Sequence, residues 1–251
     1  MISRRSFLGN AAGICACAAH GFGASANDFY AGCTLPSRQA RNLIASSSAR
    51  FGYKSALDGS LSSGDKGFDR ALAKTLVRLS DLFEVLPGFA FQELDEENAY
   101  ATSHDKFGNR DDGTVIFGRS LYKSIMNRPE NPHICVAAVC AHEFAHILQF
   151  KTGIRQRLVG PDNRVKKLEL HADFLAGYFA GIRKKESRDF PAAAFASMQH
   201  SIGDNSFGSV QHHGTAEERG AAVVAGFSSA FHMRQTLSEA IEAGISYVKR
   251  G

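Results

Sequence analysis

The sequence has no long apolar run after its first residues and no strong excess of one charge. Its later apolar stretches are interrupted by Lys, Arg, His or Asp before they reach the roughly 20 residues that a membrane-spanning helix needs. The formal net charge is only +4 over 251 residues, and 44% of the residues are hydrophobic. This composition is typical of a globular protein, and we expect no membrane span in the mature chain and no nucleic-acid partner.

Cysteine is also scarce. Only five are present, and none forms a Cys-x-x-Cys pair of the kind used in redox motifs and thiolate zinc sites. Cys33, Cys135 and Cys140 follow the first 26 residues and permit at most one internal disulfide. Cys135 and Cys140 are five apart on an expected helix and therefore point in different directions. We expect them to be small buried residues.

The N-terminus resembles a twin-arginine export signal. Arg4 and Arg5 stand in Ser-Arg-Arg-Ser-Phe-Leu, a weakly apolar stretch follows, and residues 24–26 (Ala-Ser-Ala) have the small-x-small pattern of a cleavage site. We expect residues 1–26 to be removed after delivery by the twin-arginine machinery to the periplasm or another extracytoplasmic space, which leaves a net charge of +2. Retention of this segment as a membrane anchor, or lipidation at Cys17, are the alternatives.

The remaining chain divides into an irregular, Ser-rich segment (27–64) and one domain (65–251). Apolar periodicity predicts a first helix from residue 68 that ends before Pro87. Short strands are expected at 89–91, 98–102 and 113–118, and a short helix at 120–126. Longer helices are expected at 133–151, 165–185, 192–202, 216–231 and 237–248. The predicted class is α+β, predominantly helical, with a small sheet ahead of the long helices.

The main chemical motif is His142-Glu143-x-x-His146 on the helix expected at 133–151. Two histidines four residues apart lie on one helical face, so both can reach one zinc ion. Glu143 would then take a proton from zinc-bound water and pass it to a leaving amine. Because polar residues on a largely apolar helix are costly without partners, a metal is the favoured explanation.

A third ligand is expected from the next long helix, because a catalytic zinc site keeps three protein ligands and one open position. Glu169 and Asp173 are four apart and face the same way. We assign Glu169 to the metal and Asp173 to a hydrogen bond with one zinc histidine, which fixes its tautomer. His171 is a rival ligand, but it points to another face of that helix.

These motifs resemble the gluzincins, and more closely the bacterial putative neutral zinc metallopeptidases. The resemblance covers about residues 98–227 and rests on His-Glu-x-x-His, Glu169 to Asp173 (Glu-Leu-His-Ala-Asp), Ile-Gly-Asp at 202–204, His213-Gly-Thr to Arg219, and Gly-Phe at 226–227. It implies a zincin-like metallopeptidase fold, one Zn²⁺ and a peptide or protein substrate.

The resemblance also implies a donor where oxyanion charge develops. His213 is the first candidate for this catalytic role, Arg219 the second and His212 the third. Thr215 is expected to cap the helix that begins at residue 216. This capping is compatible with a catalytic role for His213 and also with His213 merely lying near the cap.

We therefore expect an exported zinc metallopeptidase in which Glu143 activates zinc-bound water. One alternative is an exported binding or chaperone module that holds zinc as a structural staple. Another is metal-dependent hydrolysis of something other than peptides, which would use the same site.

Overall fold

The structure, a computed structural model, describes residues 62–103 and 110–250. The elements in chain order are α3 (Lys66–Phe83), β1 (Gly88–Gln92), β2 (Ala99–Thr102), β3 (Thr114–Gly118), α4 (Arg119–Met126), α5 (Pro132–Thr152), α6 (Ile154–Leu158), α7 (Lys166–Glu186), α8 (Ala193–Ser201), α9 (Ala216–Phe231) and α10 (Leu237–Arg250). The expected signal and most of segment 27–64 lie outside the described residues.

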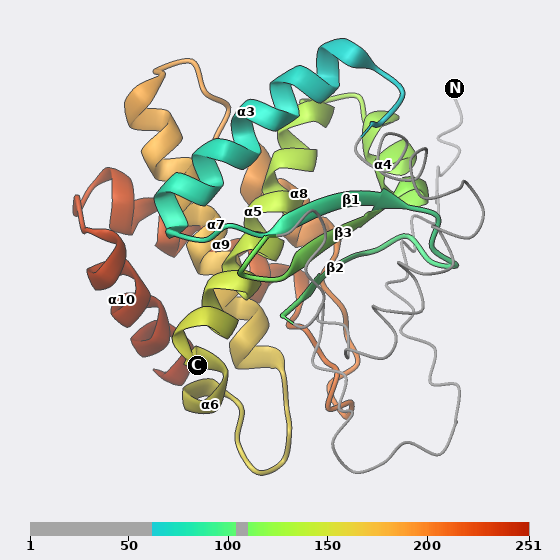
Figure 1. The fold of residues 1–251 in the computed structure, drawn as a ribbon. Helices are drawn as coiled ribbons and strands as arrows, with labels where there is room; N and C mark the ends of the chain where they lie inside the picture. Colours follow the sequence, from blue (N-terminus) through green and yellow to red (C-terminus); the bar gives the residue numbers. More distant parts are fainter. Residues whose placement is uncertain (1–61, 104–109, 251) are drawn as a thin grey trace, which may run out of the picture.

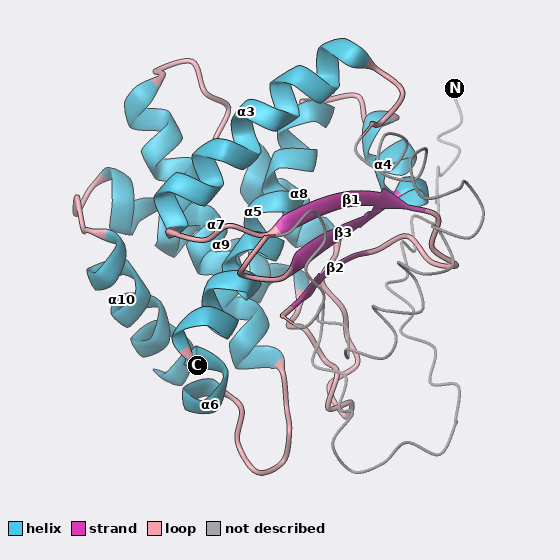
Figure 2. Cartoon of the chain, viewed as in Figure 1, coloured by secondary structure: helices cyan, strands magenta, loops and turns pink. Residues whose placement is uncertain are grey.

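The described strands form a three-stranded sheet in the order β1-β3-β2. β1 pairs with β3 in parallel, and β2 pairs with β3 antiparallel, so β2 forms one edge of this sheet. All three strands are fully buried along their length, as their apolar runs require. The sheet lies to one side of the helices (Figure 1, Figure 2).

The long helix α5 runs through the centre of the molecule and packs against α3, α4, α7, α8 and the strands β2 and β3. It begins with Pro132 in its first turn and ends at Gly153, whose positive φ of 69° suits glycine. Among the described helices, it is the one long and apolar enough to cross a membrane, but 83% of its apolar window is buried inside the protein. A helix that is apolar all round belongs in a core, and α5 occupies the core here.

The second long helix, α7, packs most extensively against α9. Gly177 in α7 approaches the carbonyl of Val223 in α9, and Gly226 in α9 approaches the carbonyl of Phe174 in α7. A Cβ atom at either glycine would lie 2.0 Å or less from the facing oxygen. The two helix backbones are therefore closer than any larger side chains would permit.

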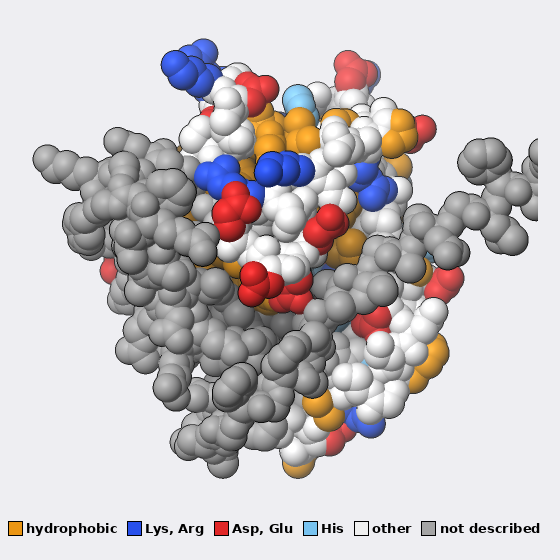
Figure 3. All heavy atoms as spheres, turned by 90° about the vertical axis from the view of Figure 1, so that its right-hand side faces the viewer, with side chains coloured by type: hydrophobic (Ala, Val, Ile, Leu, Met, Phe, Trp, Pro, Cys, Tyr) orange, Lys and Arg blue, Asp and Glu red, His pale blue; other side chains and the backbone are white. Residues whose placement is uncertain are grey.

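The predicted α+β, predominantly helical class is confirmed, and each expected helix and strand from residue 68 onward is present with ends shifted by a few residues at most. The short helix α6 was not expected. The face on the right-hand side of Figure 1 carries acidic, basic and apolar side chains close together (Figure 3).

Candidate metal centre

The helix α5 brings two histidine rings together at its buried face. His142 and His146 are 2% and 0% exposed, and their ring centroids lie 4.6 Å apart in an edge-to-face arrangement. The two Nε2 atoms are 3.1 Å apart. The spacing of the motif therefore has the geometric result expected from the helix period.

The helix α7 brings Glu169 to the same point. Its Oε2 lies 3.2 Å from Nε2 of His142, and its Oε1 lies 3.5 Å from Nε2 of His146. The three side chains are buried, and each offers one ligand atom within 4.8 Å of the others. This buried group could bind a metal ion.

The hydrogen bonds behind the rings settle which nitrogen of each ring carries hydrogen. Nδ1 of His142 lies 2.8 Å from Oδ1 of Asp173, and Nδ1 of His146 lies 2.8 Å from Oε1 of Gln149. Because both oxygens accept, each Nδ1 donates. In the neutral rings both Nε2 lone pairs then face each other and Glu169. A divalent cation bound between these acceptor atoms would remove the repulsion among them. Two neutral imidazoles and one carboxylate are a set of ligands that binds zinc in proteins.

The two acids on α7 remain ionised although they are fully buried. Burial alone would raise the pKa of Glu169, but the two histidines beside it hold that pKa well below its ordinary value. Burial would likewise raise the pKa of Asp173, and the charge of Arg219 and the hydrogen bond from His142 lower it. Both carboxylates are therefore available as acceptors or ligands.

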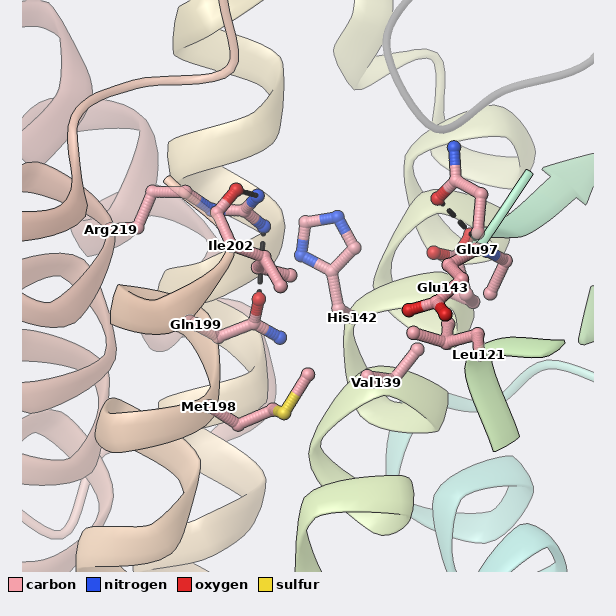
Figure 4. Close-up of a pocket in the computed structure, with 11 residues that line it drawn as sticks. Glu97, Leu121, Val139, His142, Glu143, Met198, Gln199, Ile202 and Arg219 are labelled. Carbon is pink, nitrogen blue, oxygen red and sulfur yellow. Dashed lines mark hydrogen bonds between the residues drawn. The ribbon is translucent and has the colours of Figure 1, made fainter. Parts of the chain in front are cut away.

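The guanidinium of Arg219 is engaged behind the site. This side chain is 1% exposed and donates to both oxygens of Asp173, at 2.8 and 3.0 Å. It also donates to Oε1 of Gln199 at 2.9 Å (Figure 4). Arg219 was the second candidate for the oxyanion donor. Its contacts instead give it the role of charge partner to Asp173, because an unpaired buried carboxylate would be costly.

Glu143 lies beside the two histidines and lines a pocket. The walls of the pocket include Val139, Leu121 and Glu143 on one side and Met198 and Ile202 on the other (Figure 4). Within the described chain, the buried Oε2 of Glu143 has no hydrogen-bond partner. Burial raises the pKa of Glu143 to about 8 before any cation is bound. A bound cation would lower that value and leave a base facing the pocket.

The loop between α8 and α9 carries two further buried histidines. Asp204 accepts from Nδ1 of His212 at 2.7 Å and from the backbone N–H of His213 at 2.9 Å. The Nε2 atoms of both rings are buried and have no partner among the described residues. Burial lowers the pKa of His213, and the charge of Glu169 opposes that shift.

The remaining expectations about single residues have clear outcomes. Thr215 caps α9 in a capping box with Glu218. His171 turns away from the metal ligands, with Nε2 3.2 Å from the carbonyl oxygen of Ile241. Cys135 and Cys140 are buried and form no disulfide in the structure, whereas Cys33 lies outside the described residues.

Several polar residues around the centre were missed in the sequence. They are Asn98, Gln149 and Gln199, which contribute to the hydrogen bonding or the pocket. Asp204 belongs to the Ile-Gly-Asp segment noted in the sequence, but the sequence did not predict its bonds to the two loop histidines. Gln149 offered a signal, because it lies three residues after His146 in an apolar run, where a polar side chain needs a partner. The partners of Gln199 depend on which helices meet, and no local pattern encodes that.

No family model, curated protein or solved structure matches this chain.

Proposed function

We propose that this chain is an exported zinc-dependent metallopeptidase with a zincin-like fold, related to the bacterial neutral zinc metallopeptidases. The observation that carries the proposal is the convergence of Nε2 of His142, Nε2 of His146 and the Glu169 carboxylate in one buried group, with Glu143 beside it at a pocket. The tautomers imposed by Asp173 and Gln149 direct both lone pairs to that point. The export route comes from the N-terminal sequence alone.

Zinc held by these residues would supply a Lewis acid that polarises a carbonyl and makes water a stronger acid. The chain itself supplies the proton transfers. Glu143 takes a proton from the attacking water as the water oxygen bonds to the carbonyl carbon. It then delivers that proton to the peptide nitrogen as the C–N bond breaks. Its unpartnered Oε2 leaves an acceptor free for this step.

The start of β2 supports a peptide substrate. Asn98 and Ala99 lie there and line the pocket. The buried Nδ2 of Asn98 has no partner in the described structure and can donate to a substrate carbonyl.

His213 is assigned to the charge that develops on the carbonyl oxygen. Its buried, unpartnered Nε2 and its electrostatic interaction with Glu169 support this role. His212 has an equally unpartnered Nε2 and a carboxylate behind its ring, so it is the second candidate for the same role.

Two other functions use the same residues. A binding or chaperone module would hold zinc as a structural staple, which normally fills four positions with protein ligands. The described residues place three ligand groups at the centre, which favours the enzyme. Hydrolysis of a bond other than a peptide bond would use the same metal ligands and the same Glu143, and would not require Asn98 as a donor to a peptide carbonyl.

The decisive experiment is a metal analysis and a peptide-library cleavage assay on the wild type, Glu143→Gln and Glu130→Gln. We expect about one zinc per chain in all three proteins and a loss of cleavage of ~100-fold or more in Glu143→Gln alone. Glu130 is exposed in the bend that precedes α5 and serves as the matched control. Full cleavage by Glu143→Gln would refute the mechanism, and zinc binding without cleavage by the wild type would favour the binding module.

The same assay separates the two loop histidines. Loss of one oxyanion donor lowers kcat by about 100- to 1,000-fold, so His213→Ala is expected to lose kcat with little change in KM. His212→Ala is expected to lose less. The reverse order of effects would assign the donor to His212.

A further inference from the structure

Gln149 is a fully buried side chain on α5, one turn after His146, and each of its polar atoms is used. Its Oε1 lies 2.8 Å from Nδ1 of His146. Its Nε2 lies 2.9 Å from the carbonyl oxygen of Leu168 and 3.0 Å from Nδ1 of His171. One neutral amide thus connects a metal-ligand histidine on α5 with two groups on α7.

The direction of these bonds follows from a single contact. The Leu168 carbonyl can only accept, so the amide atom beside it must be the NH₂ group. Oε1 of Gln149 therefore faces His146 and accepts its Nδ1–H. The ring of His146 is thus fixed in the tautomer whose Nε2 points at the metal centre.

A second histidine holds the amide in place. Nδ1 of His171 accepts from Gln149, so its Nε2 carries hydrogen and donates to the carbonyl of Ile241 in α10 at 3.2 Å. Gly244 of α10 lies against the same ring: a Cβ there would be 3.0 Å from Cδ2 of His171. The ring is thereby enclosed between α5, α7 and α10.

The neutral amide also matches the charge of its surroundings. Asp173 supports His142, and Arg219 compensates its charge. Behind His146, the other neighbours of residue 149 are the lone pairs of Leu168 and His171, and a carboxylate there would face two further acceptors. An amide satisfies all three contacts, whereas a carboxylate satisfies one.

We propose that Gln149 is a positioning residue for the metal ligand His146, and that His171 on α7 holds Gln149 in that position. The proposal rests on the metal site of the proposed function, but not on peptide hydrolysis. The two histidine ligands are supported by different groups, a charged pair behind His142 and a neutral relay behind His146.

The test measures zinc affinity by competition with a chromophoric chelator, in the full chain and in Gln149→Met, His171→Phe and the double variant. Methionine has a similar length and makes none of the three bonds. Loss of a group that orients a metal ligand costs about 10- to 100-fold in affinity, which is the expected effect of Gln149→Met. His171→Phe leaves the bond between Gln149 and Leu168 intact and is expected to lose less zinc affinity than Gln149→Met. The double variant should bind zinc as tightly as Gln149→Met does.

Gln92→Met is the matched control. Gln92 is another buried glutamine, at the end of β1, the strand at the far edge of the sheet from β2. We expect it to retain the wild-type zinc affinity. The visible spectrum of the cobalt-substituted protein is expected to change in Gln149→Met and not in Gln92→Met, because only the former alters the orientation of a ligand.

A purely structural role would have a different result. In that case Gln149→Met would lower the unfolding free energy of the metal-free protein and bind zinc within twofold of the wild type, which would overturn the proposal. If Gln149→Met does not fold, unchanged zinc affinity in His171→Phe overturns it. Tight zinc binding without cleavage by the wild type would remove the peptidase proposal and leave this one standing, whereas a wild type that binds no zinc would remove both.

Discussion

Several buried polar side chains surround the candidate metal centre, and each one is stable only through its particular partners. His171 is the clearest case, because its imidazole is 0% exposed and makes only the two bonds to Gln149 and Ile241 among the hydrogen bonds described. Burial lowers the pKa of His171 from 6.5 to about 4. An imidazole in such surroundings is held in its neutral form.

This shift predicts a loss of stability in acid. The unfolded chain binds a proton at His171 near pH 6.5, and the folded chain binds it only near pH 4. The contribution of the neutral ring is therefore complete above about pH 6.5 and is lost as the pH falls toward 4. At about 1.4 kcal/mol per unit, the difference reaches ~3 kcal/mol.

The measurement is the urea unfolding free energy of the metal-free protein between pH 7 and 4. The His171→Gln variant is expected to lose less stability over this range than the wild type, by up to ~3 kcal/mol. His232→Gln, at an exposed position, is the control and should retain the wild-type slope. Equal slopes in His171→Gln and the wild type would show that His171 does not control this acid sensitivity.

At the same scale, the sequence predicted the residues whose relation is local. The pairs His142 and His146, and Glu169 and Asp173, are each four apart on a helix, so their common direction follows from the helix period. Gln149 depends on the contact of α5 with α7, and Asp204 on the path of a loop. Neither contact has a local period, so the sequence pattern did not predict their bonds.

Helices and strands were predictable wherever apolar residues recur at a regular spacing. The helix α3 shows this, because Phe68, Leu72 and Leu79 recur at helical spacing and are all buried. The five-residue α6 has too few residues to establish a period and was missed. The parallel pairing of β1 with β3 joins strands that are distant in the chain, and strand order is not encoded in the strands' own composition.

The approach of α7 to α9 predicts a position at which alanine is not tolerated. Glycine to alanine in an exposed helix interior stabilises a protein by up to ~1 kcal/mol. At Gly226, however, the new Cβ would lie 1.7 Å from the carbonyl oxygen of Phe174, which belongs to the backbone of α7 and has no side-chain freedom. We expect Gly226→Ala to lower the unfolding free energy by ~1–3 kcal/mol or more.

Gly220→Ala in the same helix is the matched control. The nearest atom to a Cβ at Gly220 is Cβ of His200 at 3.5 Å, an ordinary contact. This variant is expected to be as stable as the wild type or slightly more stable, by urea unfolding. If Gly226→Ala is more stable than Gly220→Ala, the backbones of α7 and α9 do not lie as close together as described.

At the scale of the whole molecule, the apolar core is far more extensive than the candidate metal centre. The core joins α3, the sheet, α5, α7 and α8 through a large set of buried apolar side chains, whereas the candidate metal ligands come from α5 and α7 alone. A core of this extent does not depend on an ion in the way a zinc finger does. We expect the chelator-treated protein to remain folded and to unfold cooperatively.

Zinc should then add stability by binding the folded state only, because the unfolded chain does not keep His142, His146 and Glu169 together. Zinc at 100 times its Kd contributes about 2.7 kcal/mol. For a domain of this size that raises Tm by about 5–10 °C. Thermal unfolding with zinc and with excess chelator tests this, with Glu143→Gln keeping the rise, since Glu143 is not a ligand, and Glu169→Gln losing most of it. A Tm that is the same with zinc and with chelator in the wild type would mean that the three side chains do not form a metal site.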